Sequence, residues 1–269
     1  MTFLSLGLIA LTTLSACGPT TAPASVPAAS QPDDADPAEE LLARLEDAAA
    51  GLRDFRADIT FYKWDNVLER KEIRTGELIY QVRSGGDRSK RFAILFTSEI
   101  IGNRKSDQKK TYVFDGSWFV EIDHDTRMFL KRQIVPPDQH YDPLKLGEGP
   151  FPLPLGQPRQ EVLSRFRASL LDKPQDERLA GFLADASVEG LLLVPKPSTP
   201  QADQILQVEI FYDSATLLPV GLALTETNGD RKTILLRNLK RNEGIDEAKL
   251  SIEEPDPREW DIDVREWRD

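Results

Sequence analysis

The chain has 269 residues, of which 40% are apolar and 29% are charged, and its formal net charge is -11. This acidity argues against nucleic acid as a partner, because a phosphate-binding surface needs clustered Lys and Arg, and against adsorption to an anionic membrane through a basic patch. Cys17 is the single cysteine, so an intrachain disulfide and a Cys-based zinc site are both excluded.

The N-terminus is typical of a bacterial lipoprotein signal. Residues 3–16 form an apolar run that is too short to span a bilayer but suits a signal-peptide core. The run ends in Leu14-Ser15-Ala16-Cys17-Gly18, which resembles the lipobox and implies cleavage before Cys17 and acylation of that residue. No Lys or Arg precedes the run, so either the true start lies upstream or the signal is atypical. A plain secretory signal with a chance cysteine is the alternative.

Beyond the signal, composition divides the chain into a linker, a folded domain and a tail. Residues 17–37 are rich in Pro, Ala, Ser and Thr, which favours an extended tether between an acylated cysteine and the domain. We expect the folded domain at residues 38–261 and a charged tail at 262–269. Asp36 and Pro37 predict a helix start, and leucines at helical spacing follow it as far as Leu52.

Alternating patterns predict a mainly β domain with a few helices. Strands are expected at residues 55–64, 73–83 and 92–96, and at 127–135 after a central hairpin at 111–123. Short turns between consecutive strands indicate antiparallel pairing, since parallel neighbours need long crossovers. In the central hairpin, Asp115-Gly116 predicts a two-residue turn.

The second half of the domain begins with an insert. Residues 136–158 are rich in Pro and Gly, so no regular element is expected there. A helix is predicted at 159–171 and a further helical turn or two at 176–184. Strands then resume at Val188 and continue to a last strand at 249–254, for about nine or ten strands in all.

The order of these elements resembles the LolA/LolB-like bacterial lipoprotein carriers. The resemblance is carried by Leu193-Val194-Pro195-Lys196, by ILQVEIFYD and by the closing run LTETNGDRKTILLRNLKRNEG. Phe55-Arg56-Ala57-Asp58-Ile59 and Asp115-Gly116 with Trp118 match in the first half. The resemblance implies an unclosed antiparallel β-barrel, a half-barrel, with helices packed as a lid around an apolar cavity that takes acyl chains.

Two sets of site residues follow from this resemblance. Arg83 matches the arginine that holds the lid through helix carbonyls, although Ser84 replaces the family's proline and an insertion at 85–90 follows. An exposed arginine at a strand end is the alternative. For the acyl-chain cavity we expect a lining of large apolar residues from several strands and the helix that follows the insert, namely Ile59, Phe61, Leu78, Ile94, Trp118, Val120 and Phe166.

No constellation of catalytic residues accompanies the predicted strands. Asp123-His124-Asp125 could suggest a metal site, but adjacent strand residues point to opposite faces, so a solvated turn is predicted. No nucleophile-elbow sequence occurs in the chain. We therefore expect no enzymatic activity, no cofactor and no metal.

The sequence leads to one functional hypothesis and one alternative. The hypothesis is a monomeric, lipid-anchored carrier or receptor in the envelope of a two-membrane bacterium, facing the periplasm from the outer membrane. Its partners would be the acyl chains of lipoproteins or lipids, and a partner carrier or inner-membrane complex. The alternative is an envelope sensor or scaffold that uses the same cavity and acts through protein contacts.

Overall fold

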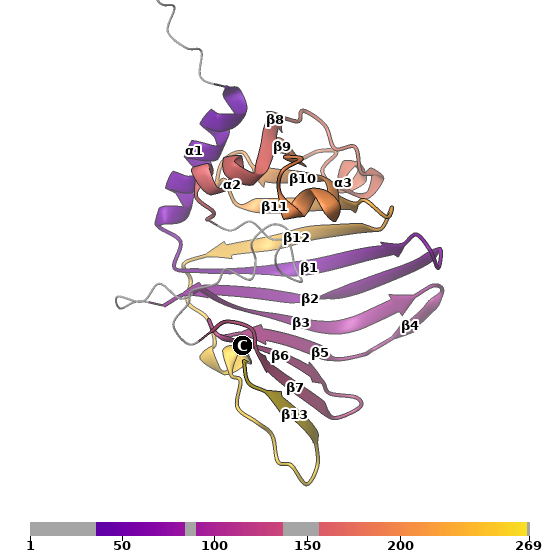
Figure 1. Ribbon diagram of the computed structural model, residues 1–269. Coiled ribbons are helices and arrows are strands. Elements are labelled where there is room, and N and C mark those ends of the chain that lie inside the picture. Colours follow the sequence, from indigo (N-terminus) through magenta and orange to yellow (C-terminus); the bar gives the residue numbers. More distant parts are fainter. Residues whose placement is uncertain (1–35, 84–89, 137–155, 268–269) are drawn as a thin grey trace, which may run out of the picture. The chain divides into compact units, whose positions relative to one another are not determined.

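A single large β-sheet organises the chain, with few helices against it (Figure 1). The computed structural model describes residues 36–83, 90–136 and 156–267. Within them the sheet has thirteen strands in the order β13-β7-β6-β5-β3-β2-β1-β12-β11-β10-β9-β8, with β4 paired to β3. The sheet is not closed, because β13 and β8 end the order without pairing to each other. The predicted mainly β, unclosed fold is confirmed.

The strands of the first half are β1 (Asp54–Asp65), β2 (Arg70–Val82), β3 (Lys90–Ile101), β4 (Arg104–Ser106), β5 (Lys110–Phe114), β6 (Trp118–Asp123) and β7 (Met128–Gln133). Those of the second half are β8 (Phe166–Leu170), β9 (Val188–Pro195), β10 (Ile205–Asp213), β11 (Pro219–Glu226), β12 (Arg231–Arg241) and β13 (Asp261–Arg265). The α-helices are α1 (Pro37–Ala50), α2 (Arg159–Arg165) and α3 (Glu177–Phe182), and the 3₁₀ helices are η1 (Pro200–Asp203) and η2 (Glu247–Leu250).

Helix α1 begins as its sequence predicts. The Asp36 carboxylate accepts the N–H of Ala38 at 2.9 Å, and Pro37 stands at the first helical position, where its missing N–H is no loss. Such a cap contributes about 1 kcal/mol. The helix buries Ala38, Leu41 and Leu42, which belong to one apolar cluster with side chains of α2 and of β8 to β11. We call the side of the sheet that it covers the α1 face.

The opposite face of the sheet is covered in two places. At one end, Leu179 and Leu183 from α3 and its C-terminus pack on Phe211, Ala223 and Leu235. At the other end, the chain between β12 and β13 packs on β2, β3, β5, β6 and β7 with four apolar side chains, which are Ile245, Leu250, Ile252 and Trp260. Both faces of the sheet are therefore apolar, and each needs cover from outside the sheet.

The central hairpin turns where the sequence predicts. The carboxylate of Asp115 accepts the N–H groups of Ser117 at 2.9 Å and Trp118 at 2.8 Å. Gly116 has a φ of 113°, a backbone conformation that residues other than glycine rarely adopt. Because residues 115–117 all lie between β5 and β6, the connection is one residue longer than the predicted two-residue turn.

Two predicted elements are wrong. The helix expected at 159–171 stops at Arg165, and Phe166–Leu170 form β8, which pairs with β9 from Phe166↔Pro195 to Leu170↔Leu191. Apolar residues at 162, 166 and 170 fit a helix, but 166, 168 and 170 fit a strand equally well, and tertiary pairing decides between them. The strand expected at 249–254 is instead η2 followed by irregular chain.

The last strand, β13, departs from the antiparallel pattern. It pairs in parallel with β7, from Asp261↔Met128 to Arg265↔Arg132, after the irregular segment that covers the opposite face. The chain that joins β7 to β13 is residues 134–260, which is long enough for the parallel pairing that a tight turn forbids. β13 lies mostly in the segment expected to be a charged tail, and its Asp263 and Arg265 side chains pair with each other.

A substitution at Gly76 tests how closely β2 and β3 approach each other. It lies at a shift of register between the two strands, and a Cβ at this position would lie 2.0 Å from the Leu95 carbonyl oxygen. We expect Gly76→Ala to lower the free energy of unfolding by about 1–3 kcal/mol, because the obstructing atom belongs to the backbone. Urea unfolding measures the change.

Gly181→Ala is the matched control for this substitution. Gly181 lies in α3 and has no atom within 4 Å of an added Cβ, so alanine should leave stability unchanged or raise it by up to about 1 kcal/mol. Equal effects of the two substitutions would contradict the close approach of the strands at Gly76.

Glu209 makes stability depend on pH. Its side chain is buried beneath the segment that leads into α3, and it accepts the N–H groups of Gln175 at 2.8 Å and Asp176 at 3.3 Å. Burial raises the pKa of Glu209 above its ordinary value, the two backbone N–H groups oppose this, and the Asp176 carboxylate adds to it. The folded protein therefore binds this proton more tightly than the unfolded chain does.

The raised pKa of Glu209 contributes to the free energy of unfolding at low pH. This contribution should be lost as the pH rises from the pKa of glutamate in the unfolded chain through the higher pKa in the folded protein. In Glu209→Gln the amide oxygen can still accept both N–H groups but does not titrate. We expect the free energy of unfolding of the native protein, relative to this variant, to fall across that window and then level off. Urea unfolding over a pH series measures the difference, and a difference that rises with pH would contradict the assignment.

Candidate functional site

The α1 face of the sheet carries two apolar clusters that meet along β1 and β12. One lies over β1, β2, β3 and β5 and includes a row of rings from Phe61, Phe92, Phe96, Tyr112, Phe114 and Phe119. Neighbouring rings in this row have centroids 6.1–6.5 Å apart, within the range of favourable aromatic contacts. The other cluster lies beneath α1, over β8 to β11.

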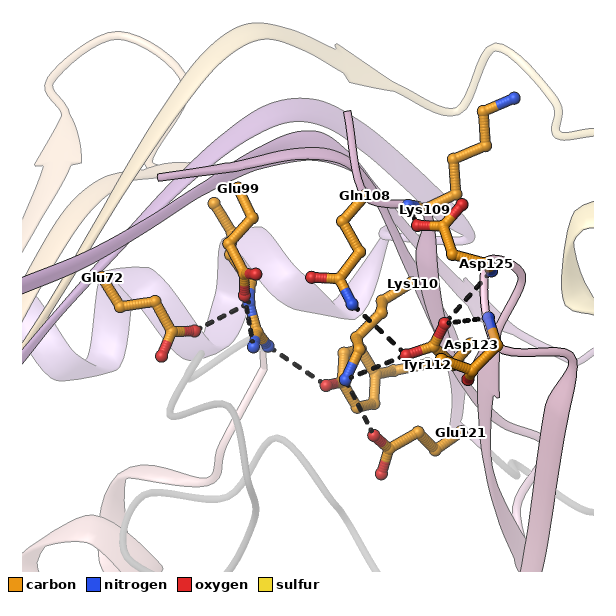
Figure 2. Close-up of polar contacts among 11 residues, drawn as sticks. Glu72, Glu99, Gln108, Lys109, Lys110, Tyr112, Glu121, Asp123 and Asp125 are labelled. Carbon is orange, nitrogen blue, oxygen red and sulfur yellow. Dashed lines mark hydrogen bonds and ion pairs between the residues drawn. The ribbon is translucent and has the colours of Figure 1, made fainter. Parts of the chain in front are cut away.

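A polar network borders the aromatic row (Figure 2). The Arg74 guanidinium lies 2.8 Å from the carboxylate of Glu99 and donates a hydrogen bond of 3.1 Å to the Tyr112 hydroxyl. Lys110 lies 3.4 Å from the Asp123 carboxylate and 3.8 Å from that of Glu121. Arg74 and Lys110 each face two carboxylates, so their charges are compensated and this polar border of the apolar face has an excess of negative charge.

Burial, hydrogen bonds and neighbouring charges together set the protonation states in this network. Burial raises the pKa of the Tyr112 hydroxyl, an effect that the neighbouring Arg74 opposes. For Asp123, hydrogen bonds from Thr126 and the Lys110 charge outweigh the effect of burial, and its pKa lies below the ordinary range. At neutral pH the phenol is therefore protonated and the carboxylate ionised.

Beneath α1 the apolar cluster leaves a small pocket of about 40 Å³. Its wall is formed mainly by aliphatic side chains of α1 and of β9 to β11, including Leu42, Leu45, Leu191, Leu193 and Ile210. The polar side chains in the wall are Gln157, Tyr212 and Thr216. Pockets that bind small molecules usually measure about 300–1,000 Å³, so this one is too small for such a ligand as it stands.

Polar contacts hold α1 over the pocket. The Arg241 guanidinium, on β12, donates a hydrogen bond of 2.7 Å to the Ala48 carbonyl in the last turn of α1, where a cation also complements the helix dipole. Arg44 pairs with Glu189 on β9, and Glu46 accepts the N–H of Arg159 at 3.2 Å. None of these polar side chains belongs to the pocket wall, to which α1 contributes Leu42, Leu45, Ala48 and Ala49.

The structure brings together four of the seven residues that were predicted to line a cavity. Ile59, Phe61, Leu78 and Ile94 belong to one cluster on the α1 face. Phe166 lies on the same face but in the cluster beneath α1. Val120 packs on the opposite face, against the chain that follows β12.

Trp118 lies on the same side of β6 as Val120, because the two are separated by one residue in a strand. Its ring contacts Lys131, whose Nζ is 5.2 Å from the ring centroid. The sheet therefore separates Trp118 and Val120 from the other five predicted residues, and we do not include them in the site.

Arg83 is exposed just after the end of β2. Its charge helps to lower the pKa of Glu247, after larger contributions from Gln81 and Arg91. The contact between an arginine and a carbonyl of α1 is made by Arg241 instead. Cys17, the expected lipidation site, lies outside the described residues.

The Asp123-His124-Asp125 sequence forms a turn. Asp123 accepts the N–H groups of Asp125 at 3.1 Å and Thr126 at 3.0 Å, and the His124 ring lies 3.1 Å from the Thr111 hydroxyl. Within the described ranges no group of three or more His, Cys, Asp or Glu side chains could hold a metal ion. None of the helices described there is long and apolar enough to cross a membrane.

Comparisons with known proteins give only distant structural likenesses. No family model matches the chain, and no curated protein matches it. An uncharacterized conserved protein from Thermus thermophilus is 12% identical with a TM-score of 0.45, covering 86% of this chain and 99% of that one.

Two further solved structures are similar at the same level. The Pseudomonas aeruginosa MucA/MucB complex matches at 16% identity and a TM-score of 0.44, covering 80% of this chain and 60% of that one. A LolA superfamily protein from Nitrosomonas europaea matches at 7% identity and a TM-score of 0.34, covering 80% and 97%. With TM-scores below 0.5 these likenesses carry no functional argument.

Proposed function

We propose that this protein binds the acyl chains of lipids or lipoproteins between α1 and the sheet, as a membrane-anchored carrier or receptor. The observation that carries the proposal is the pocket beneath α1, whose wall is aliphatic apart from three polar side chains. Each methylene group removed from water contributes about 0.8 kcal/mol, so a long acyl chain needs few polar contacts to bind. The sequence resemblance to lipoprotein carriers supports the same ligand class.

Binding in this place requires α1 to move. The pocket of about 40 Å³ is too small for an acyl chain, but the helix is held partly by contacts that are weak in water. The Arg44 side chain is 51% exposed, and an exposed ion pair contributes about 0–1 kcal/mol. Methylene groups of the acyl chain would then contact β9 and β10 where leucines of α1 do in the closed form. The free energy gained by burying these methylenes would offset the packing energy that is lost when the helix moves away.

Leu45→Gln tests whether the ligand occupies this pocket. Leu45 lines it from α1, and an amide in the wall should weaken binding of a fluorescent fatty acid to the full chain about tenfold, because burying an unpaired polar group is unfavourable. Fluorescence titration gives the dissociation constants, and mass spectrometry of the purified protein identifies acyl species bound to it.

Leu206→Gln is the matched control. Leu206 is 56% exposed on β10 and is not part of the pocket wall, so its substitution should leave the affinity unchanged. If the native protein does not bind the fatty acid, the proposed function is wrong. If both variants bind as the native protein does, the ligand site lies elsewhere.

Arg241→Met tests how α1 is held closed. Methionine keeps an apolar stem but loses the hydrogen bond to Ala48, which we value at about 1 kcal/mol. We expect amides in the last turn of α1 to exchange about fivefold faster with deuterium, and the fatty acid to associate faster by a similar factor. Hydrogen exchange and stopped-flow fluorescence measure the two rates.

Lys240→Met is the control for this variant, because Lys240 is exposed and pairs with Glu243 at 3.4 Å. It should alter neither rate. Unchanged rates in Arg241→Met would show that this hydrogen bond does not hold the helix over the pocket.

A further inference from the structure

Tyr212 differs from the other polar residues of the pocket wall. It lies near the end of β10, on the α1 face, and is 4% exposed. Around it the wall is aliphatic, with Ile210 on the same strand and Leu191 on β9. A phenol in such surroundings normally has a hydrogen-bond partner.

The Tyr212 hydroxyl has no such partner among the described residues, whereas the other two polar side chains of the wall do. Gln157 accepts a hydrogen bond of 3.4 Å from Arg165. Thr216 donates one of 2.8 Å to the Asp213 carboxylate. A phenol hydroxyl that faces an apolar pocket wall without a partner is uncommon in folded proteins, and it calls for an explanation.

Protonation fixes what the Tyr212 hydroxyl can offer. Burial raises the pKa of Tyr212, so the phenol stays neutral at physiological pH and its O–H is available as a donor. No charged group contributes to that shift, which means that the environment of the ring is apolar. Since no described residue accepts from this hydroxyl, an acceptor that arrives with the ligand can pair with it.

We propose that Tyr212 donates a hydrogen bond to the carbonyl oxygen of the bound acyl group, so that the pocket selects acyl compounds over bare hydrocarbons. This inference rests on the proposed function, and it adds a specificity-determining residue to it. The carbonyl is the one polar group that fatty acids, esters and N-acyl amides share. It is also bonded directly to the hydrocarbon chain, so it lies beside the methylenes that an apolar pocket would bury.

The test compares two ligands of one chain length on the full chain. A fatty acid methyl ester and the corresponding alkane each compete with a fluorescent alkyl probe that has no carbonyl group. Tyr212→Phe keeps the ring and removes the hydroxyl. We expect the variant to bind the ester about fivefold to tenfold more weakly than the native protein, and the alkane with unchanged affinity.

Tyr62→Phe is the matched control. Tyr62 packs with the cluster on the opposite face, where Arg178 lies over its ring at 5.3 Å, so its substitution should change the affinity for neither ligand. The infrared carbonyl band of the bound ester gives a second measurement, independent of affinity. It should lie at lower frequency in the native protein than in Tyr212→Phe.

The outcomes separate the two proposals. If the native protein binds both ligands and Tyr212→Phe weakens neither, or weakens both equally, the hydroxyl does not recognise the carbonyl and this inference is wrong while the acyl site stands. If the native protein binds neither ligand, the proposed function fails and this inference fails with it. An unshifted carbonyl band in the native protein would also overturn the inference.

Discussion

The packing of α1 against β9 and β10 is the contact on which the functional proposal depends. The sheet is apolar on both faces, and a sheet of this kind must be covered on each side or leave apolar surface in water. The opposite face is covered by α3 and by the chain after β12. Helix α1 covers its part of the sheet with leucines, and we propose that the methylenes of an acyl chain can replace them there.

Much of the architecture follows from local pattern, and its errors have definite physical causes. The start of α1, the strands of the first half and the turn at Asp115-Gly116 were predictable, because capping, alternation and positive φ act within a few residues. β8 was not, since Phe166 and Leu170 fit both periods and only pairing with β9 selects the strand. The parallel strand β13 depends on a partner more than a hundred residues away in sequence, which no local rule supplies.

The site was predictable only in part, for reasons of geometry. Alternation identifies which residues share a face of one strand but not which faces of distant strands coincide, and Trp118 and Val120 were misplaced for that reason. Arg241 was missed because of a shift in register. Strand β12 pairs Arg237 with Asp58 but Lys240 with Arg56, so β12 has one extra residue between these two pairs. Asn238 has a positive φ within this irregular stretch. The extra residue moves Arg241 onto the α1 face. Simple alternation from Ile234 would have placed it on the other side.

The displacement of α1 by the ligand can be measured directly as a distance. Spin labels at Glu40, exposed on α1, and at Leu206, exposed on β10, report the separation of helix and sheet by pulsed electron resonance. We expect the separation to increase when a fatty acid is added to the full chain, because the closed pocket has no room for it. A fatty acid that binds without any change in this distance would contradict the proposal that acyl chains enter beneath α1.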